Sequence, residues 1–420
     1  MARKTTGMLG KGEIIEINGL TLKRLQGGAL GVNLSNEDMK QMGDGGVIER
    51  KSNLPDTSLK LDFNAIGYVG NFMLMAGYKN SGWMPQLNSG LCFTMTSAGM
   101  DINGDATLGF DTNNMPEIVA RYSEFNDTVL SRSAYVPGMF VNSYELRAAT
   151  DGVATESFSL AGDSKTDYDG ASKDIRVVVC YPIAATSSAT WDPGYADFSS
   201  GYTFVKAFVN RIDSYTTEVT PSFATNSLAI AGVTFDGTER VVMLLTKDTS
   251  QAFPGLADTN ERGGLRRGAI VISLHKATEA ETKSLRIQSV AATLNLGRIA
   301  SNEMGTQRDV DRVVTYPVPV KADITINDND LEMMKQMVGT SSTVVDANNY
   351  VNDMVVTMSF YNSETVHLAA NLLCKVTMSG MKVASENSDG KAGASFGTRT
   401  FSLEGNNFIM SGTGVNPFVL

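Results

Sequence analysis

The sequence predicts a mainly β chain built from two tandem β-sandwich or barrel units, each with a short flanking α-helix, and a β-rich segment inserted between them. Three observations support this prediction. Segments with strand patterns recur along the chain, helix signals are few and short, and one nine-residue pattern occurs in both halves. With 420 residues, the chain is long enough for two or three domains with sizeable cores.

Strand patterns dominate the sequence. Some segments alternate apolar and polar residues or are rich in β-branched residues, as expected of half-buried strands, and others are continuous apolar runs, as expected of buried ones. The clearest strand candidates are residues 59–63, 175–179, 269–274, 285–290, 321–326 and 355–360. Hairpin tips are expected at the Asp-Gly pairs, which are residues 151–152, 236–237 and 389–390.

Helix signals are confined to three short segments. Ser35–Asp38 has the pattern of an N-cap followed three residues later by an acid, which predicts a helix over Met39–Met42. The same signal at Asn327–Asp330 predicts a helix over Leu331–Met337, and residues 277–284 are a third candidate. The prediction is therefore one short helix in each unit.

An internal repeat is the most informative feature. Thr155–Asp163 matches Thr398–Asn406 without a gap, with identical Thr, Phe, Ser, Leu and Gly residues. Met-Lys-Gln-Met occurs at residues 39–42 and again at 334–337. A single nine-residue match could arise by chance in a chain rich in Ser, Thr and Gly. Two matched motifs in the same order favour a duplication instead.

The matched motifs also set the expected domain boundaries. The first unit is predicted to span residues 1–170 and the second residues 284–420, with an intervening β-rich segment at 171–283. The two motifs lie farther apart in the first half than in the second. The first unit is therefore expected to carry an insertion at about residues 80–130.

Residues that usually carry catalysis or bind metals are scarce. The chain has three cysteines and two histidines, without the spacing of a zinc site or a disulfide framework. Residues 393–397 have the spacing of a hydrolase nucleophile elbow around Ser395, but no histidine follows in the chain. Residues 101–105 begin like a calcium loop, but Thr112 stands where the closing glutamate is needed. We therefore predict no enzyme activity, no metal and no cofactor.

The charge of the chain argues against a protein that grips nucleic acid. The formal net charge is -10, and only 19% of the residues are charged. Arg262, Arg266 and Arg267 form the densest basic stretch and are candidates for a phosphate or inter-subunit contact, with a solvated loop or ion pairs as the alternative. The sequence shows neither a signal-peptide pattern nor an apolar run of transmembrane length. We expect a chain made in the cytoplasm.

Two regions resemble the tail tube proteins of tailed bacteriophages. Residues 143–149, followed by Thr155–Ser164, are similar to the strand–turn–strand of these proteins. Residues 317–339 look like their strand followed by a short helix. The resemblance covers residues 1–170 and 284–420. Its motifs are structural patterns without a fixed functional residue.

The resemblance implies a β-sandwich or barrel-like unit related to the tube proteins of type VI secretion. Such units form rings, usually of six, that stack into a hollow tube, and their inner strands join across subunits to line a channel for genomic DNA. If this chain carries two units, three chains would supply the six, in a trimeric ring with pseudo-sixfold symmetry. The insertion and the intervening segment are then expected on the outer surface of the tube.

The expected partners are other copies of this chain, other tail proteins and, without sequence preference, DNA in the lumen, with no membrane partner. The expected location is the virion tail, after assembly in the host cytoplasm. A neutral or acidic channel would keep DNA mobile, which is compatible with the net charge. The alternatives are another tail or baseplate protein, such as a hub, terminator or sheath subunit, and a β-rich receptor- or carbohydrate-binding protein.

Overall fold

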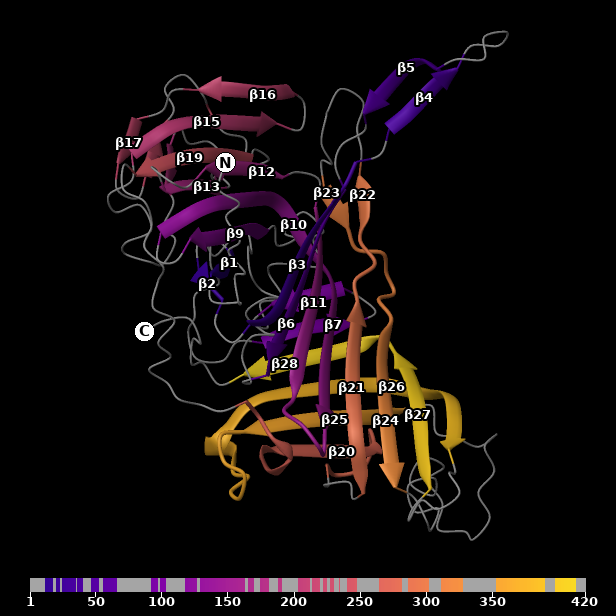
Figure 1. Ribbon diagram of the computed structural model, residues 1–420. Coiled ribbons are helices and arrows are strands. Elements are labelled where there is room, and N and C mark those ends of the chain that lie inside the picture. The colour runs from indigo at the N-terminus through magenta and orange to yellow at the C-terminus, as the bar shows by residue number, and fades with distance from the viewer. Residues whose placement is uncertain are drawn as a thin grey trace, which may run out of the picture.

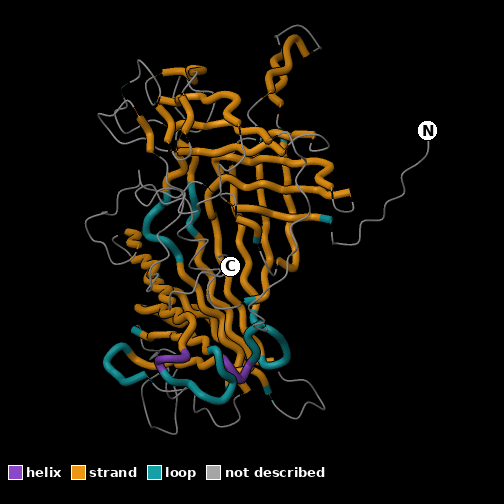
Figure 2. The backbone as a smooth tube through the Cα atoms, turned by 90° about the vertical axis from the view of Figure 1, so that its left-hand side faces the viewer, coloured by secondary structure: helices purple, strands orange, loops and turns teal. Residues whose placement is uncertain are grey.

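Within the residues that it describes, the computed structural model is mainly β (Figure 2). Its helical elements, within the residues described, are two 3-10 turns, η4 (Arg267–Ala269) and η6 (Ala369–Asn371). The predicted mainly β class is confirmed. The structure describes residues 12–17, 20–22, 25–34, 36–40, 47–52, 56–65, 92–96, 99–102, 118–126, 129–162, 165–169, 174–180, 188–190, 203–211, 214–219, 222–224, 227–229, 234, 240–247, 264–281, 286–301, 311–327, 353–389 and 397–412.

The largest element is an eight-stranded antiparallel sheet, called the main sheet below. Several of its strands stand upright in Figure 1, among them β21 and β24. In hydrogen-bonded order, its strands are β3 (Leu25–Asn33), β6 (Asp56–Asn64), β11 (Thr155–Gly162), β10 (Val129–Ala149), β21 (Ile287–Asn295), β24 (Val320–Asn327), β27 (Thr398–Gly405) and β26 (Leu372–Asp389).

Two further sheets share the long strands β10 and β26 with the main sheet. The first side sheet has the order β2 (Leu20–Thr21), β1 (Glu13–Ile17), β9 (Ile118–Asn126), β10 and β12 (Thr166–Asp169). The second side sheet has the order β20 (Ile270–Lys276), β25 (Met354–Tyr361), β26, β28 (Asn407–Gly412), β7 (Cys92–Thr96) and β8 (Gly99–Ile102). In both long strands the N-terminal part belongs to a side sheet and the C-terminal part to the main sheet.

The remaining strands form smaller sheets. A four-stranded sheet lies in the upper left of Figure 1, with the order β13 (Asp174–Cys180), β19 (Arg240–Lys247), β15 (Thr203–Arg211) and β16 (Ser214–Val219). A three-stranded sheet has the order β14 (Ser188–Thr190), β18 (Ser227–Ala229) and β17 (Ser222–Ala224). The connections β3–β6 and β21–β24 each contain a hairpin, respectively β4 (Asn36–Lys40) with β5 (Val47–Ser52), and β22 (Ile299–Ser301) with β23 (Asp311–Val313).

The core lies between the main sheet and the side sheets. Side chains alternate along β11, so that Phe158 and Leu160 are buried while Ser157 and Ser159 face outward. The Phe158 ring packs against Phe63, with ring centroids 5.9 Å apart, and against Tyr144, at 4.9 Å. Burying each such aromatic side chain contributes roughly 1.5–3 kcal/mol to folding.

The predicted strands are confirmed at the positions that the structure describes. Residues 59–63, 175–179, 321–326 and 355–360 lie within β6, β13, β24 and β25. The candidates at 269–274 and 285–290 become β20 and β21, which begin one and two residues later and extend beyond the predicted ends. The predicted hairpin tip at residues 151–152 is a turn between β10 and β11. Residues 236–237 lie outside the described part of the chain.

The predicted helix over Met39–Met42 is wrong. Its first residues belong to β4, which pairs with β5 over Asn36–Lys40. An N-cap pattern is a local signal, and a helix of one turn is marginal unless tertiary packing stabilises it. The candidate over residues 277–284 is also corrected, because residues 277–281 form a turn that follows β20. The helix predicted over Leu331–Met337 lies outside the described residues.

Two predicted boundaries are crossed by strand pairing. β20 lies in the segment expected between the units, yet it pairs with β25 in the second side sheet. β7 and β8 lie in the expected insertion at about residues 80–130, and β7 pairs with β28. The predicted insertion therefore contributes strands to a sheet formed mainly by the C-terminal part of the chain.

A glycine with positive φ marks the point where each long strand passes from a side sheet to the main sheet. Gly138 in β10 has φ of 73°, and Gly380 in β26 has φ of 66°. Both lie inside a register shift, the first against β9 and the second against β25. A non-glycine residue in the left-handed region costs about 1–2 kcal/mol, so glycine lets each strand bend without that strain.

Replacing either glycine with alanine is expected to lower the free energy of unfolding by about 1–2 kcal/mol, because the backbone must keep a left-handed φ. The measurement is the midpoint of denaturant unfolding of Gly138→Ala and Gly380→Ala. Gly152→Ala is the matched control, since an added Cβ there meets nothing within 4 Å. Equal midpoints for all three variants and the parent chain would contradict the role of these glycines.

Candidate assembly edges

The main sheet contains one strand order twice. The strands β3, β6, β11 and β10 are followed, in the same sense, by β21, β24, β27 and β26. β11 and β27 carry the repeated motif, and both are central strands with the same kind of neighbours. Thr155 lies opposite Asn64, and Thr398 lies opposite Asn327. The two sets of four strands thus share their register as well as their order.

Register shifts also fall at equivalent positions. The β10–β11 pairing shifts between Val141 and Ser143, and the β26–β27 pairing shifts between Val383 and Ser385. A bulge inserts one unpaired residue into a ladder and bends the strand. Because both long strands bulge opposite the same residues of the repeated motif, they bend at the same place.

The glycine that ends the repeated motif has the same surroundings in both sets. A Cβ on Gly162 would lie 3.2 Å from the carbonyl oxygen of Gly138, and a Cβ on Gly405 would lie 3.2 Å from that of Gly380. The methionine after each positive-φ glycine would also be in close contact, at 3.2 Å for Met139 and 2.5 Å for the sulfur of the equivalent residue. The motif therefore requires glycine here because the backbones approach closely.

A second repeat, which the motif comparison missed, lies on the first strand of each set. β3 shifts between Leu25 and Gly27, and β21 shifts between Ile287 and Ser289, so a glutamine is the bulged residue in both. In this register LQGGALGVNL aligns with IQSVAATLNL, with identical Gln, Ala, Asn and Leu residues. Aligning the chain with itself outward from the Phe-Ser-Leu motif could have found this match.

The two sets meet where β10 pairs with β21, a contact called the internal junction below. Leu294 and Leu296 are buried there, with 0% and 2% of their surface exposed. The backbone N–H of Leu296 donates to the Asn142 carbonyl at 2.8 Å. Arg298 Nε donates to the Val141 carbonyl at 2.8 Å. The internal junction is a buried, backbone-paired contact between the last strand of one set and the first strand of the next.

The outer edges of the main sheet carry the equivalents of the two strands that meet in the internal junction. In the described part of the chain, β3 pairs only with β6, and the C-terminal part of β26 pairs only with β27. Val32 and Leu34, at the positions of Leu294 and Leu296, are 40% and 68% exposed. An unpaired edge with exposed apolar side chains is a surface that favours pairing with another strand.

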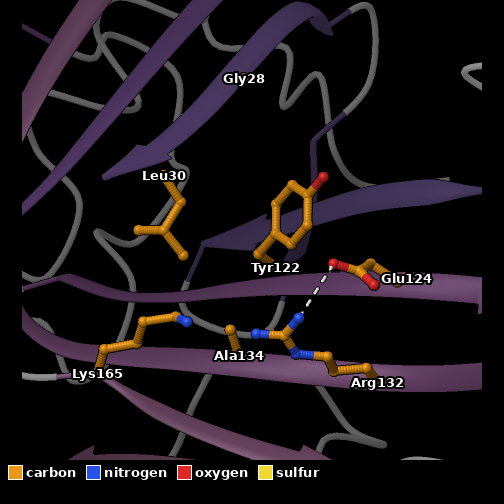
Figure 3. Close-up of a pocket in the computed structure, with 7 residues that line it drawn as sticks. All are labelled: Gly28, Leu30, Tyr122, Glu124, Arg132, Ala134 and Lys165. Carbon is orange, nitrogen blue, oxygen red and sulfur yellow. Dashed lines mark ion pairs between the residues drawn. The ribbon is translucent and has the colours of Figure 1, made fainter. Parts of the chain in front are cut away.

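A charged pocket lies beside β3, between the main sheet and the first side sheet (Figure 3). Its volume is about 260 Å³. The lining residues are Gly28, Leu30, Tyr122, Glu124, Arg132, Ala134 and Lys165. In Figure 3 the Arg132 guanidinium faces the Glu124 carboxylate, and their closest nitrogen and oxygen atoms are 3.8 Å apart.

Asp167 links the two basic residues of the pocket. Its carboxylate accepts from Arg132 Nη2 at 2.8 Å and from Lys165 Nζ at 2.9 Å. Burial acts to raise the pKa of Asp167, but the hydrogen bonds from Lys165 and Arg132 outweigh it and hold that pKa below its usual value. Burial, followed by a hydrogen bond to Glu13, raises the pKa of Tyr122. The pocket therefore presents fixed charges of both signs.

The same position in the second side sheet is apolar. Cross-strand pairing places Cys374 where the first side sheet has Arg132, and Phe408 where the first has Lys165. Both are buried, and Phe408 packs against Tyr144 of β10, with ring centroids 6.2 Å apart. The internal junction thus closes over the second side sheet, while the pocket over the first side sheet stays open beside the β3 edge.

The outward face of the main sheet is polar. Small Ser, Thr, Asn and Gly residues alternate with paired charges, such as Lys321 and Glu404, whose closest atoms are 2.8 Å apart. Ser157 donates to Asp62 at 2.6 Å on the same face. This face therefore carries charges of both signs, some in ion pairs and some, such as exposed Arg147 and Lys382, on long side chains that reach into solvent.

Arg266 and Arg267, two of the three arginines predicted as contact residues, do not lie on the outer edges. Arg266 forms an isolated bridge with Val153, next to the β10–β11 turn, and Arg267 begins η4. Both side chains are exposed. Arg262 and Ser395 lie outside the described residues. Sequence reasoning missed the outer edges and the charged pocket, because both are built from strands far apart in the sequence.

No group of three or more metal-ligating side chains is found in the described ranges. Cys374 is a free, buried thiol, and burial together with the Glu156 carboxylate raises its pKa. No helix among the described residues is long and apolar enough to span a membrane.

A buried ion pair distinguishes the first side sheet from the second. Arg121 Nη1 donates to the Glu16 carboxylate at 2.9 Å, and both side chains are 4% exposed. The pairing of β1 with β9 and of β20 with β25 places Ser273 and Thr357 at the equivalent positions. These two residues are also buried. The second side sheet therefore fills the same position with neutral polar residues.

Arg121→Thr alone is expected to lower the free energy of unfolding by about 3–5 kcal/mol, because it leaves the Glu16 carboxylate buried without its partner. Adding Glu16→Ser, which copies the second side sheet, should recover part of this loss. The measurement is denaturant unfolding of the single and double variants. A double variant less stable than Arg121→Thr would contradict the equivalence of the two positions.

A comparison with protein-family models finds no match to this sequence. A comparison with curated proteins likewise finds no significant match.

Proposed function

We propose that this chain is a structural subunit that polymerises into stacked rings forming the tail tube of a bacteriophage, a channel through which DNA passes. The observation that carries the proposal is the repeated strand order and register of the main sheet. In the described part of the chain, this arrangement leaves one side of β3 unpaired at one end of the sheet and one side of the C-terminal part of β26 unpaired at the other. We interpret the repeat as a duplication that yields two tandem units. The resemblance of the repeated motif to tail tube proteins then suggests a ring of three chains and six units.

The free edges support a closed ring. Each unit has the same first strand and the same last strand, so the last strand of one unit can pair with the first strand of the next. Such heterologous contacts form a closed ring when a whole number of rotations between units makes a full turn. The internal junction already joins two units side by side. A ring would repeat that contact until no free edge remained.

The outward face of the main sheet supports a channel lining. Many of its described side chains are small and polar, and its cations are interspersed with carboxylates, as in the Lys60–Asp62 and Lys321–Glu404 ion pairs. The described part of the face therefore differs from the one-sign cationic surface that binds DNA phosphates. A surface of this kind allows a charged polymer to slide, because it offers no strong binding site. A face on which cations and carboxylates are interspersed supports passage of DNA without retention.

Purified protein at micromolar concentration is expected to form rings or tubes visible by negative-stain electron microscopy. Class averages of end-on views should show threefold symmetry with six similar densities around a hole. A single ring at one position of a particle would favour the hub or terminator alternative, and an outer layer around a tube would favour a sheath. Monomers at every concentration would contradict the proposal.

A further inference from the structure

We propose that the two outer edges of the main sheet bind each other between copies of this chain in the register of the internal junction, and that Glu386 of one copy enters the charged pocket of the next. The inference rests on the proposed function and deepens it. It names the contact surface, the partner, which is a second copy of this chain, and the pairs of residues that meet.

The internal junction supplies the register. Ser143 of β10 lies opposite Asn295 of β21. The equivalent residues on the outer edges are Ser385 of β26 and Asn33 of β3, because the bulges align the long strands and the first strands of the two sets. In this register, β26 of another copy would pair with β3 in the way that β10 pairs with β21 in the internal junction.

The exposed apolar residues of β3 support this occupant. Val32 and Leu34 stand at the positions of Leu294 and Leu296, which the internal junction buries almost completely. An equivalent contact would remove both side chains from water, worth about 25 cal/mol for each Å² of apolar surface covered. The edge therefore has the apolar side chains of a junction without its partner strand.

The charges across the proposed contact are complementary. In the internal junction Tyr144 of β10 packs on Phe408 of the second side sheet. Glu386 has the position of Tyr144 on β26, and Lys165 has the position of Phe408 in the first side sheet. An aromatic pair inside the chain thus corresponds to an acid and a base across the proposed contact. The pocket beside β3 is the space that Glu386 would enter.

The partner of Glu386 follows the same correspondence. Tyr144 donates to Glu156 at 2.9 Å, and at the equivalent positions Arg399 donates to Glu386 at 2.7 Å. Glu156 lies near Cys374 and helps to raise the pKa of that thiol. Arg399 would accordingly approach Arg132, which stands at the position of Cys374. The carboxylates that already pair with Arg132 would balance the added positive charge.

Disulfide cross-linking tests directly whether Asn33 of one copy lies opposite Ser385 of the next. The variant carries Asn33→Cys and Ser385→Cys, with Cys92→Ser and Cys180→Ser to remove native thiols and buried Cys374 kept. Under mild oxidation we expect covalent dimers and trimers, and a ladder that stops at three chains, on non-reducing gels. Ser143→Cys with Asn295→Cys is the internal reference and should form the same bond within one chain.

The register control is Asn33→Cys with Asn387→Cys, two residues away along β26. Cross-linking of this pair should be about tenfold slower, because the two thiols are displaced along the strands by one two-residue repeat and lie too far apart for a disulfide. Rings seen by microscopy, with Asn33 and Ser385 cross-linking no faster than the control, would overturn the register and leave the proposed function intact. A ladder continuing beyond three chains, without rings, would support the register and overturn the ring. Monomers without cross-links would overturn both.

A charge-exchange experiment tests the proposed contact between Glu386 and the pocket. Glu386→Lys is expected to lower the fraction of assembled protein about tenfold, because it places a cation beside Lys165 and Arg132 of the next copy, as well as beside Arg399 of its own chain. Adding Lys165→Glu should restore part of the assembly by exchanging the two charges across the contact. Glu279→Lys, in the exposed turn after β20, is the control with the same change of net charge. Thermal unfolding of each variant separates a loss of assembly from a loss of folding.

Assembly restored by the exchanged charges, with little effect of Glu279→Lys, would support the contact between Glu386 and Lys165. Assembly by Glu386→Lys at the level of the parent chain would overturn the pocket contact, whatever the disulfide test shows. Failure of the double variant to recover, while it still folds, would do the same. The two tests therefore address the register and the pocket separately.

Discussion

The pairing of strand edges is the constraint on which the rest of this structure depends. Every backbone N–H and C=O in a buried strand needs a partner, and a sheet that does not close always leaves two edges. In this chain the edge between the two sets of strands is satisfied by the β10–β21 pairing. The side sheets, the bulges and the charged pocket lie next to this pairing or next to the equivalent positions at the outer edges. Whether the pairing is present therefore determines what covers each of them.

The long strands β10 and β26 connect this constraint to the core. Each passes from a side sheet into the main sheet through a glycine with positive φ, and each then bulges opposite the repeated motif. The bend allows one strand to hold two sheets at a fixed angle, so that the core is enclosed without a separate connecting element. The glycines Gly162 and Gly405 leave room for the bend, which explains why the motif ends in glycine.

Much of the secondary structure could be predicted because side-chain alternation is a local property of a strand. The Phe-Ser-Leu match was informative for the same reason, since its Phe and Leu point into the core in β11 and in β27. The match between residues 39–42 and 334–337 does not reflect the strand repeat. Extended back to the end of β3, that match would align Asn33 with residue 328, whereas the strand register aligns Asn33 with Asn295. The helix signal failed because capping residues describe one turn of chain, whereas β4 is stabilised by a partner strand.

The candidate site could not be predicted from local patterns. The outer edges become visible only when the order of all eight strands is known, and the pocket combines β3 with strands more than ninety positions away. The Gln-Ala-Asn-Leu match between β3 and β21 was present in the sequence, but its four identities are spread over ten residues. Only the aligned bulges show that these identities occupy equivalent positions.

The difference between the two junctions has a physical explanation under the proposed function. The internal junction forms once, within one chain, so it can be as apolar as a core, with Tyr144 against Phe408. A junction between chains must first exist as two separate surfaces in water, and an apolar edge of the same composition would associate without regard to register. Charged residues at the equivalent positions keep the free edges soluble and penalise wrong partners by leaving charges unpaired. Under the proposed function, the difference between the two halves at Glu386 and Lys165 is therefore the one expected of a duplicated unit with one contact within the chain and the other between chains.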